Sequence, residues 1–184
     1  MRSKPLTHAA LLLIDVINPM DFPGGASLVR QAVPAAARIA SLRKRLSATG
    51  VPVIYVNDNF GEWQSDFSEQ VRRCTRPDCP ACDVAGRLLP EKSDYFVLKP
   101  KHSGFYSTSL DVLLQYLGAR TLVLTGFAAD ICVLYTANDA YMRDYSIVVP
   151  SDCVASESAA LRKAALEQMS TRLKARVCLS RYVR

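Results

Sequence analysis

Histidine is scarce in this chain: among 184 residues there are only two, His8 and His102. A catalytic cysteine usually works with a histidine, and here only His102 could serve, because His8 precedes the first predicted strand. No apolar run approaches the ~20 residues of a transmembrane helix. No Gly-x-Gly-x-x-Gly sequence follows a predicted strand. These absences argue against a membrane partner and against a nucleotide-binding Rossmann protein.

The charge pattern lacks any nucleic-acid signature. The formal net charge is +6 and 49% of the residues are hydrophobic, an ordinary balance for a globular protein. The basic residues are spread along the chain, without interleaved aromatic residues or a nucleic-acid motif. We interpret them as solvated faces that mildly favour an anionic substrate, and we expect no nucleic-acid partner.

Six cysteines occur without a pairing pattern or a secretion signal. The short apolar run 9–14 ends on an aspartate rather than a cleavage site, so it predicts a strand and not a signal peptide. Free thiols in a reducing compartment follow, with the cytoplasm as the expected location. Cys74, Cys79 and Cys82 have part of a zinc-site spacing, but no fourth ligand is adjacent. Free loop thiols are therefore favoured over a metal, and no cofactor is expected.

Strand and helix patterns alternate along the whole chain, which is typical of a parallel sheet covered on both faces. The sequence predicts one domain, 1–184, of the three-layer α/β/α class, with a mostly parallel sheet of about six strands. We expect strands at 9–14, 52–56, 95–98, 121–124, 146–149 and 176–179, and helices at 28–48, 69–74, 110–117, 130–144 and 157–173.

The segment from 121 to 141 organises the rest. An apolar, β-branched strand ends at Thr125-Gly126, where the glycine permits a tight turn or a close backbone approach. Asp130 is placed to cap the following helix, and Cys132 lies in its first turn. Open α/β sheets bind ligands at this edge, and a helix N-terminus there lowers the pKa of a thiol. Cys132 is therefore a candidate nucleophile.

Two further reactive side chains follow strand ends. Asp15 closes the first predicted strand and Lys99 the third. Because parallel strands end at the same edge of a sheet, both can converge on Cys132. An acid, an ammonium and a thiol form a working set, in which the lysine stabilises the thiolate and the aspartate moves the proton.

These residues resemble the isochorismatase-like cysteine hydrolases, which include nicotinamidases, carbamoylsarcosine amidases and ureidoacrylate-type amidohydrolases. The resemblance covers the chain from Leu11 to about Ser156. Three motifs carry it: Leu-Leu-Ile-Asp ending at Asp15, the Lys-Pro-Lys-His-Ser-Gly-Phe sequence from Lys99, and Thr-Gly-Phe-Ala-Ala-Asp-Ile-Cys ending at Cys132. The resemblance implies a Rossmann-like isochorismatase fold and a homo-oligomer, either a dimer or a tetramer.

The resemblance also implies a catalytic triad of Asp15, Lys99 and Cys132. It implies a non-proline cis peptide bond between Phe127 and Ala128, with the N–H groups of Ala128 and Cys132 forming an oxyanion hole. The expected reaction is attack of the thiolate on an amide, ureido or carbamoyl carbonyl, followed by hydrolysis of the thioester.

The chain departs from two subgroups of this family. Nicotinamidases bind a divalent metal through an Asp-x-His pair and another histidine after the second strand, whereas residues 57–61 here are Asn-Asp-Asn-Phe-Gly. We therefore expect no metal and no nicotinamidase activity. Isochorismatase itself lacks the cysteine and acts on a vinyl ether, so Cys132 argues against that reaction as well.

The substrate remains open at this stage. The residues that we expect in the pocket wall are Phe22, Asn59, Tyr106 and Phe127. Aromatic residues in the polar stretch from Phe60 to Phe67, including Trp63, suggest either a lid over the pocket or an oligomer contact. A non-catalytic protein on the same fold, binding a small metabolite or a protein partner, is the alternative to the hydrolase.

Overall fold

The computed structural model describes residues 6–184, so the first five residues of the expected domain 1–184 lie outside the description. Among the described residues, no helix has the length and apolar character needed to cross a membrane. The strands are β1 (Ala9–Ile14), β2 (Val53–Asp58), β3 (Tyr95–Lys99), β4 (Thr121–Phe127), β5 (Ser146–Pro150), β6 (Val154–Ala155) and β7 (Arg176–Cys178). The helices are α1 (Gly25–Ser47), α2 (Phe67–Cys74), α3 (Cys82–Arg87), α4 (Leu110–Tyr116), α5 (Leu134–Met142) and α6 (Ala159–Arg172), with a π-helical turn η1 (Ala129–Val133) and a 3-10 turn η2 (Ser180–Tyr182).

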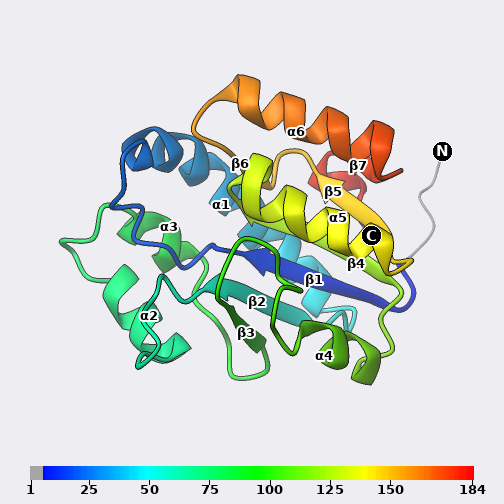
Figure 1. The fold of residues 1–184 in the computed structure, drawn as a ribbon, viewed down its shortest axis with the longest axis horizontal. Coiled ribbons are helices and arrows are strands. Elements are labelled where there is room, and N and C mark those ends of the chain that lie inside the picture. Colours follow the sequence, from blue (N-terminus) through cyan, green and yellow to red (C-terminus); the bar gives the residue numbers. More distant parts are fainter. Residues whose placement is uncertain (1–5) are drawn as a thin grey trace.

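The strands form a single sheet in the order β3-β2-β1-β4-β5-β7 (Figure 1). Every strand pair is parallel. The six predicted strands are all present, and the short strand β6 adds a seventh by pairing with the end of β4. The predicted three-layer α/β/α class is confirmed.

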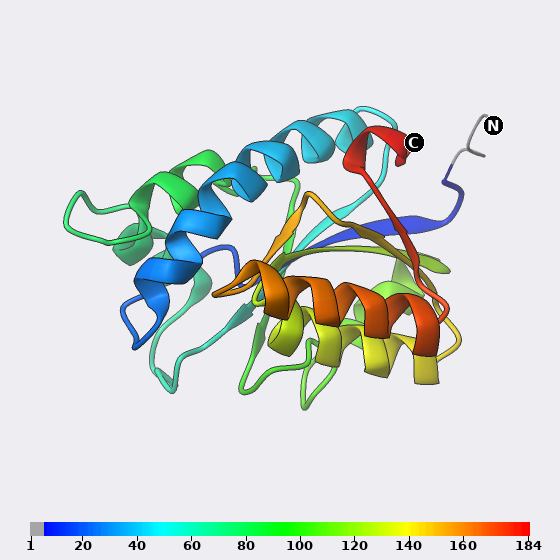
Figure 2. The ribbon, with the colours of Figure 1, turned by 90° about the horizontal axis from the view of Figure 1, so that it is seen from above.

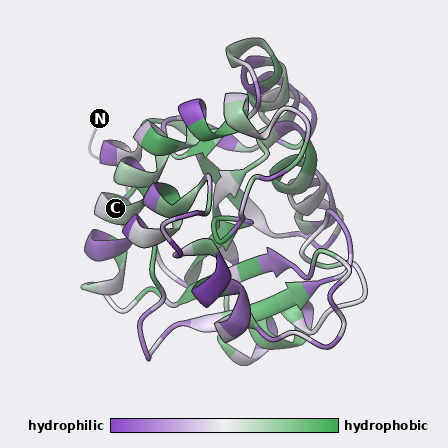
Figure 3. Cartoon of the chain, turned by 90° about the vertical axis from the view of Figure 1, so that its left-hand side faces the viewer, coloured by the Kyte–Doolittle hydropathy of each residue, from purple (hydrophilic) through white to green (hydrophobic). Residues whose placement is uncertain are grey.

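Helices cover both faces of this sheet, as the view from above makes clear (Figure 2). Alternate side chains of β1 divide between two hydrophobic cores, because neighbouring residues of a strand point to opposite faces. Leu11 and Leu13 pack in the core beneath α1, whereas Leu12 and Ile14 pack in the core beneath α4, α5 and α6. Hydrophobic strands accordingly fill the middle of the molecule, and hydrophilic residues lie on the outer helices (Figure 3).

The predicted end of β4 is wrong by three residues. The strand continues through Gly126 to Phe127 instead of stopping at Leu124. Of the two roles considered for Gly126, the structure shows the close approach, since a Cβ atom there would lie 2.0 Å from the carbonyl oxygen of Ile14. Its φ of 116° also lies in the region that favours glycine. This glycine lets β1 and β4 run together up to the residues that follow them.

The helix after β4 also differs from its prediction. It begins with the π-helical turn η1, whose capping residue is Ala128 and which has no side-chain cap. Asp130 is therefore not the N-cap, and its Oδ1 atom is buried without a hydrogen-bond partner. A π-helical turn holds one more residue per hydrogen bond than an α-helix. Cys132 therefore lies in a π-helical turn and not in the first turn of an α-helix, a detail that helical periodicity alone does not reveal.

Candidate active site

The side chains of Asp15, Lys99 and Cys132 meet at the carboxyl ends of β1, β3 and β4, as their positions in the sequence predict. The Nζ atom of Lys99 lies 2.9 Å from Asp15 Oδ2 and 3.7 Å from Cys132 Sγ. The Asp15 carboxylate also acts on the thiol, because its negative charge is one of the causes that raise the pKa of Cys132. Lys99 thus contacts both of the other groups, and Asp15 lies close enough to affect the ionisation of the thiol.

Burial makes this cluster unusual. The side chain of Lys99 is completely buried and that of Asp15 is only 4% exposed, whereas Cys132 is partly exposed. A buried ammonium is tolerated only when it is paired with negative charge. Cys132 as a residue therefore keeps some contact with solvent, while the charged groups beside it are shielded.

Sequence reasoning missed one member of the cluster, Asp58. Its Oδ2 atom lies 3.2 Å from Lys99 Nζ, and its backbone N–H donates a hydrogen bond of 2.6 Å to Asp15 Oδ1. Asp58 is the last residue of β2 and stands opposite Lys99 in the parallel register. The signal was available, because Asp58 is a third charged residue at a strand end.

The pKa values of the cluster follow from burial and from mutual contact. Burial raises the pKa of Asp15 more than its contacts with Lys99 and Cys132 lower it. Burial, and then the negative charge of Asp15, raise the pKa of the Cys132 thiol. Burial alone lowers the pKa of Lys99, but Asp15, Cys132 and Asp58 outweigh this and raise it. The expected lowering of the thiol pKa is therefore wrong, because burial and the nearby carboxylate of Asp15 both favour the neutral thiol.

The peptide bond between Phe127 and Ala128 is cis. The side chain of Phe127 is completely buried in the core beneath α1. The expectation that this side chain lines the substrate pocket is therefore wrong, because alternation along β4 directs it into the core and away from the surface.

The other expected pocket residues lie in two different environments. Phe22 is 40% exposed and Tyr106 is 56% exposed, whereas Asn59 is buried. Asn59 lies beside the cluster, since its backbone N–H donates to the carbonyl of Lys99 at 3.0 Å. The side chain of Asn59 accepts a hydrogen bond from the Gly61 N–H, so it shapes the loop after β2.

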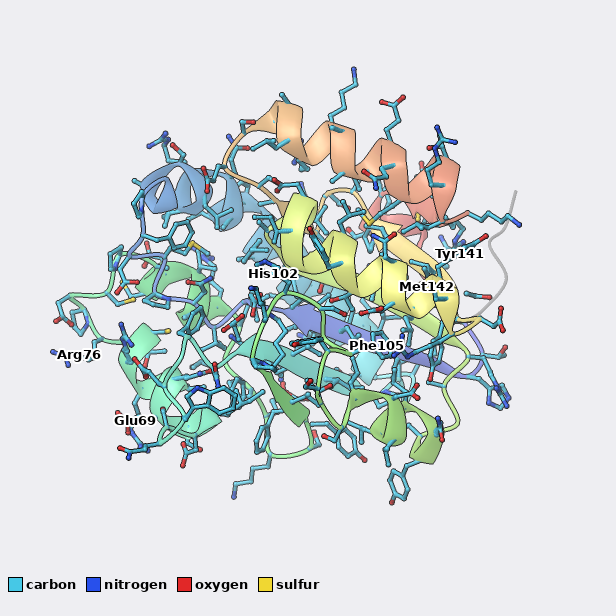
Figure 4. The ribbon with its side chains drawn as sticks, in the orientation of Figure 1. Glu69, Arg76, His102, Phe105, Tyr141 and Met142 are labelled. Atoms are coloured by element: carbon cyan, nitrogen blue, oxygen red, sulfur yellow. The ribbon has the colours of Figure 1, made fainter. Side chains whose placement is uncertain are left out.

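His102, the alternative partner for the thiol, packs elsewhere. His102 lies in the loop between β3 and α4 (Figure 4). The centre of its ring is 5.3 Å from the centre of the Tyr135 ring. Both rings line a cavity of about 210 Å³, together with Tyr106. Among the described residues, the recorded side-chain partners of the Cys132 thiol are Lys99 and Asp15, so the geometry favours an Asp-Lys-Cys arrangement over a Cys-His pair.

The other cysteines and aromatic residues that the sequence singled out divide into buried and exposed ones. Cys74 and Cys79 are buried in the core beneath α1. Phe67 is also buried there and stacks on Phe96, so it belongs to neither a lid nor an exposed contact. Trp63, by contrast, is 77% exposed. Both predicted roles of the loop around Trp63, as a lid or as an oligomer contact, remain predictions.

Possible metal ligands do not cluster in the part of the chain that the structure describes. Within residues 6–184 there is no group of three or more histidine, cysteine or acidic side chains that could hold a metal ion. The loop after β2 carries Asp58, but this carboxylate is bound to Lys99.

Known proteins are similar to this chain in fold and in sequence. Residues 9–180 match the isochorismatase domain family. An uncharacterised isochorismatase family protein of Bacillus subtilis, YaaI, is 42% identical over 91% of this chain and 92% of its own length. The ureidoacrylate amidohydrolase RutB of Methylobacterium radiotolerans is 30% identical over 88% of this chain and 72% of its own length. The crystal structure of N-carbamoylsarcosine amidase from Thermoplasma acidophilum superposes with a TM-score of 0.72 at 29% identity, covering 95% of this chain and 97% of that one.

The parallel sheet and its two helical layers define a Rossmann-like α/β protein, a class in which ligands bind at the carboxyl edge of the sheet. The sequence match then identifies the family within this fold class. It belongs to the isochorismatase family.

Proposed function

We propose that this protein is a cysteine hydrolase that cleaves a C–N bond of a small amide, ureido or carbamoyl compound through a thioester on Cys132. The observation that carries the proposal is the contact of a partly exposed thiol with a buried carboxylate and a buried ammonium. Membership of the family and similarity to an N-carbamoylsarcosine amidase and a ureidoacrylate amidohydrolase support an enzyme that acts on C–N bonds.

The first half of the proposed reaction forms the thioester. Asp15 accepts the proton of the Cys132 thiol as the sulfur attacks the carbonyl carbon. When the tetrahedral intermediate collapses, the C–N bond breaks and Asp15 gives that proton to the leaving nitrogen. Ammonia or an amine departs, and the acyl or carbamoyl group remains on the sulfur.

The second half returns the thiol. Asp15 accepts a proton from a water molecule as the water oxygen attacks the thioester carbonyl. The C–S bond then breaks, and Asp15 returns the proton to the sulfur of Cys132. The product is a carboxylic or carbamic acid, and the site regains its starting charge.

Lys99 has an electrostatic role in this scheme. Its ammonium lies within reach of both Asp15 and Cys132, so it stabilises negative charge as the proton moves between them. The backbone N–H groups of Ala128 and Cys132 are the proposed donors to the oxyanion. Removing one such donor from a hydrolase typically costs about 10²-fold or more in turnover.

The proposed substrate is small, and its carbonyl approaches from the exposed side of Cys132. Asn59, Phe22 and Tyr106 are the candidates for contact with the rest of the substrate. Asn59 is the candidate with the most support, because its backbone N–H is hydrogen-bonded to the backbone carbonyl of Lys99.

Release of ammonia from a panel of amides, ureido acids and carbamoyl compounds tests the proposal. The wild-type protein should release ammonia from at least one class, and Cys132→Ala should not. Turnover that survives unchanged in Cys132→Ala would refute the proposed nucleophile. Trapping of the thioester by rapid acid quench, followed by mass spectrometry of the peptide with Cys132, provides an independent readout.

We also infer that the enzyme works as a homo-oligomer, a dimer or a tetramer, in the cytoplasm. All six cysteines are free thiols, as in proteins of a reducing compartment. Large hydrophobic side chains remain exposed on the surface, among them Trp63 and Tyr116, and these suit a contact between copies. Analytical ultracentrifugation measures the state directly, and a monomer at micromolar concentration would contradict the inference.

A further inference from the structure

Asp58 has a place in the cluster that the proposed triad leaves unexplained. Lys99 Nζ has two carboxylate neighbours, Asp15 at 2.9 Å and Asp58 at 3.2 Å. The first neighbour follows β1 and the second ends β2, so the ammonium of β3 contacts the end of the adjacent strand β2 and reaches past it to the end of β1. A buried lysine needs one carboxylate for charge balance, and this lysine has two.

Asp58 is also held firmly in position. Its Oδ1 atom accepts the backbone N–H of Phe60 at 2.8 Å. Its carbonyl accepts a hydrogen bond of 3.0 Å from the buried amide of Gln70, and its own N–H donates to Asp15 Oδ1 at 2.6 Å. The Asp58 carboxylate thus has one oxygen for the loop and one for Lys99.

We propose that Asp58 is a positioning residue of this site: its carboxylate shares the Lys99 ammonium with Asp15 and so sets how strongly that ammonium acts on Asp15 and on the Cys132 sulfur. The effect of this role on catalysis rests on the proposed function, whereas the contacts of Asp58 are independent of it.

The charges around the Lys99 ammonium determine how Asp58 affects the ionisation of the Cys132 thiol. They are Asp15 from the end of β1, Asp58 from β2 and the Cys132 sulfur from η1. Two carboxylates and one ammonium leave the cluster with one net negative charge. That charge disfavours ionisation of the thiol, and the negative charge of Asp58 is one of the causes that raise the pKa of Cys132. The negative charge of Asp58 also weakens the attraction between Lys99 and Asp15, so the Asp15 carboxylate remains a better proton acceptor.

The test compares Asp58→Asn with the wild-type protein in the rate of Cys132 alkylation by iodoacetamide as a function of pH. Asparagine keeps the size of aspartate and can still accept the Phe60 N–H, but it removes the negative charge. The midpoint of the alkylation profile should move to lower pH, and the rate at pH 7.5 should rise roughly three- to tenfold, which corresponds to a pKa change of about half a unit to one unit. Mass spectrometry of the Cys132 peptide gives the rate at this site alone.

Three controls accompany the measurement. Asp58→Glu restores the charge and should return the rate toward that of the wild type. Asp78→Asn makes the same chemical change at an exposed ion pair with Arg76, and it should leave the profile unchanged. Asp58→Ser is a second neutral variant in case Asp58→Asn unfolds at a lower temperature, and its profile should shift in the same direction.

An alkylation profile that stays in place, or moves to higher pH, in both neutral variants would overturn the role of Asp58. A shifted profile in a protein that hydrolyses nothing would support this role and count against the proposed function. Turnover that requires Cys132, together with an unshifted profile, would support the hydrolase and refute the inference. With an active substrate, the acidic limb of kcat/KM should also move to lower pH in Asp58→Asn.

Discussion

Cys132 and Cys74 have much in common, and the comparison shows what distinguishes a candidate nucleophile from a core residue. Burial is the largest cause of a raised thiol pKa in both, reaching about 12 for Cys74. Cys74 is only 1% exposed and packs in the hydrophobic core beneath α1. Cys132 is partly exposed and contacts Lys99 and Asp15.

The free-protein pKa therefore does not identify the reactive cysteine. What differs is access for a ligand, and the presence of a base and a cation within reach of the sulfur. A neutral thiol with a carboxylate beside it can lose its proton during attack, whereas a neutral thiol among aliphatic side chains cannot. Four measurements test this difference between the two cysteines.

The largest expected effect is on turnover. Cys132→Ala should reduce kcat by about 10³-fold or more, since covalent catalysis is lost. Cys74→Ala should stay within about threefold of the wild type, because Cys74 touches no group of the cluster that is proposed to react. Steady-state ammonia release on the best substrate measures both. Equal losses in the two variants would remove the distinction.

Alkylation should follow the same order. At pH 8 iodoacetamide should modify Cys132 at least about tenfold faster than Cys74, because only the first sulfur is accessible in the folded protein. After unfolding in urea, the two rates should become similar. Peptide mass spectrometry over time gives both rates, and faster labelling of Cys74 in the native protein would contradict the structure.

The pH dependence of catalysis should report on Asp15. The proposed base acts when it is ionised, and burial raises its pKa above the ordinary value of 3.8. Activity should therefore fall as the pH drops, with the acidic limb of kcat/KM lying above the range of an ordinary aspartate. A limb at or below pH 3.8 would show that burial does not govern this carboxylate, or that another group is the base.

Stability should show the smallest effect, and in the opposite order. Cys74→Ala removes a fully packed sulfur and should lower the free energy of unfolding by about 1–2 kcal/mol. Cys132→Ala should lower it less, since a partly exposed side chain loses fewer contacts. Urea denaturation followed by circular dichroism compares the two, and a larger loss for Cys132→Ala would reverse the assignment of core and site.

Sequence patterns predicted the sheet and the meeting of Asp15, Lys99 and Cys132, because strand periodicity and parallel topology fix where strand ends lie. They did not predict the contact of Asp58 with Lys99. That contact depends on the register between β2 and β3, which is a relation between two distant segments.

The misplaced residues have a similar explanation. Phe127 was expected in the pocket wall, yet β4 continues past Gly126 and directs the ring into the core. Asp130 has the residue type of a helix cap, but the cap position of η1 is Ala128, two residues earlier, so Asp130 lies inside the turn. In both cases an element boundary moved by a few residues, and local propensity determines such boundaries poorly.

The close approach at Gly126 has a consequence for how this scaffold could change. The backbones of β1 and β4 meet there without an intervening side chain, so the separation of Asp15 from Cys132 depends on the main chain. The loops that carry Phe22 and Tyr106 lie outside this junction, whereas the loop of Asn59 is hydrogen-bonded to Lys99. Insertions or substitutions in the first two loops should therefore change the surface at this edge of the sheet while Asp15, Lys99 and Cys132 keep their spacing, which makes those two loops the natural place to engineer the proposed specificity.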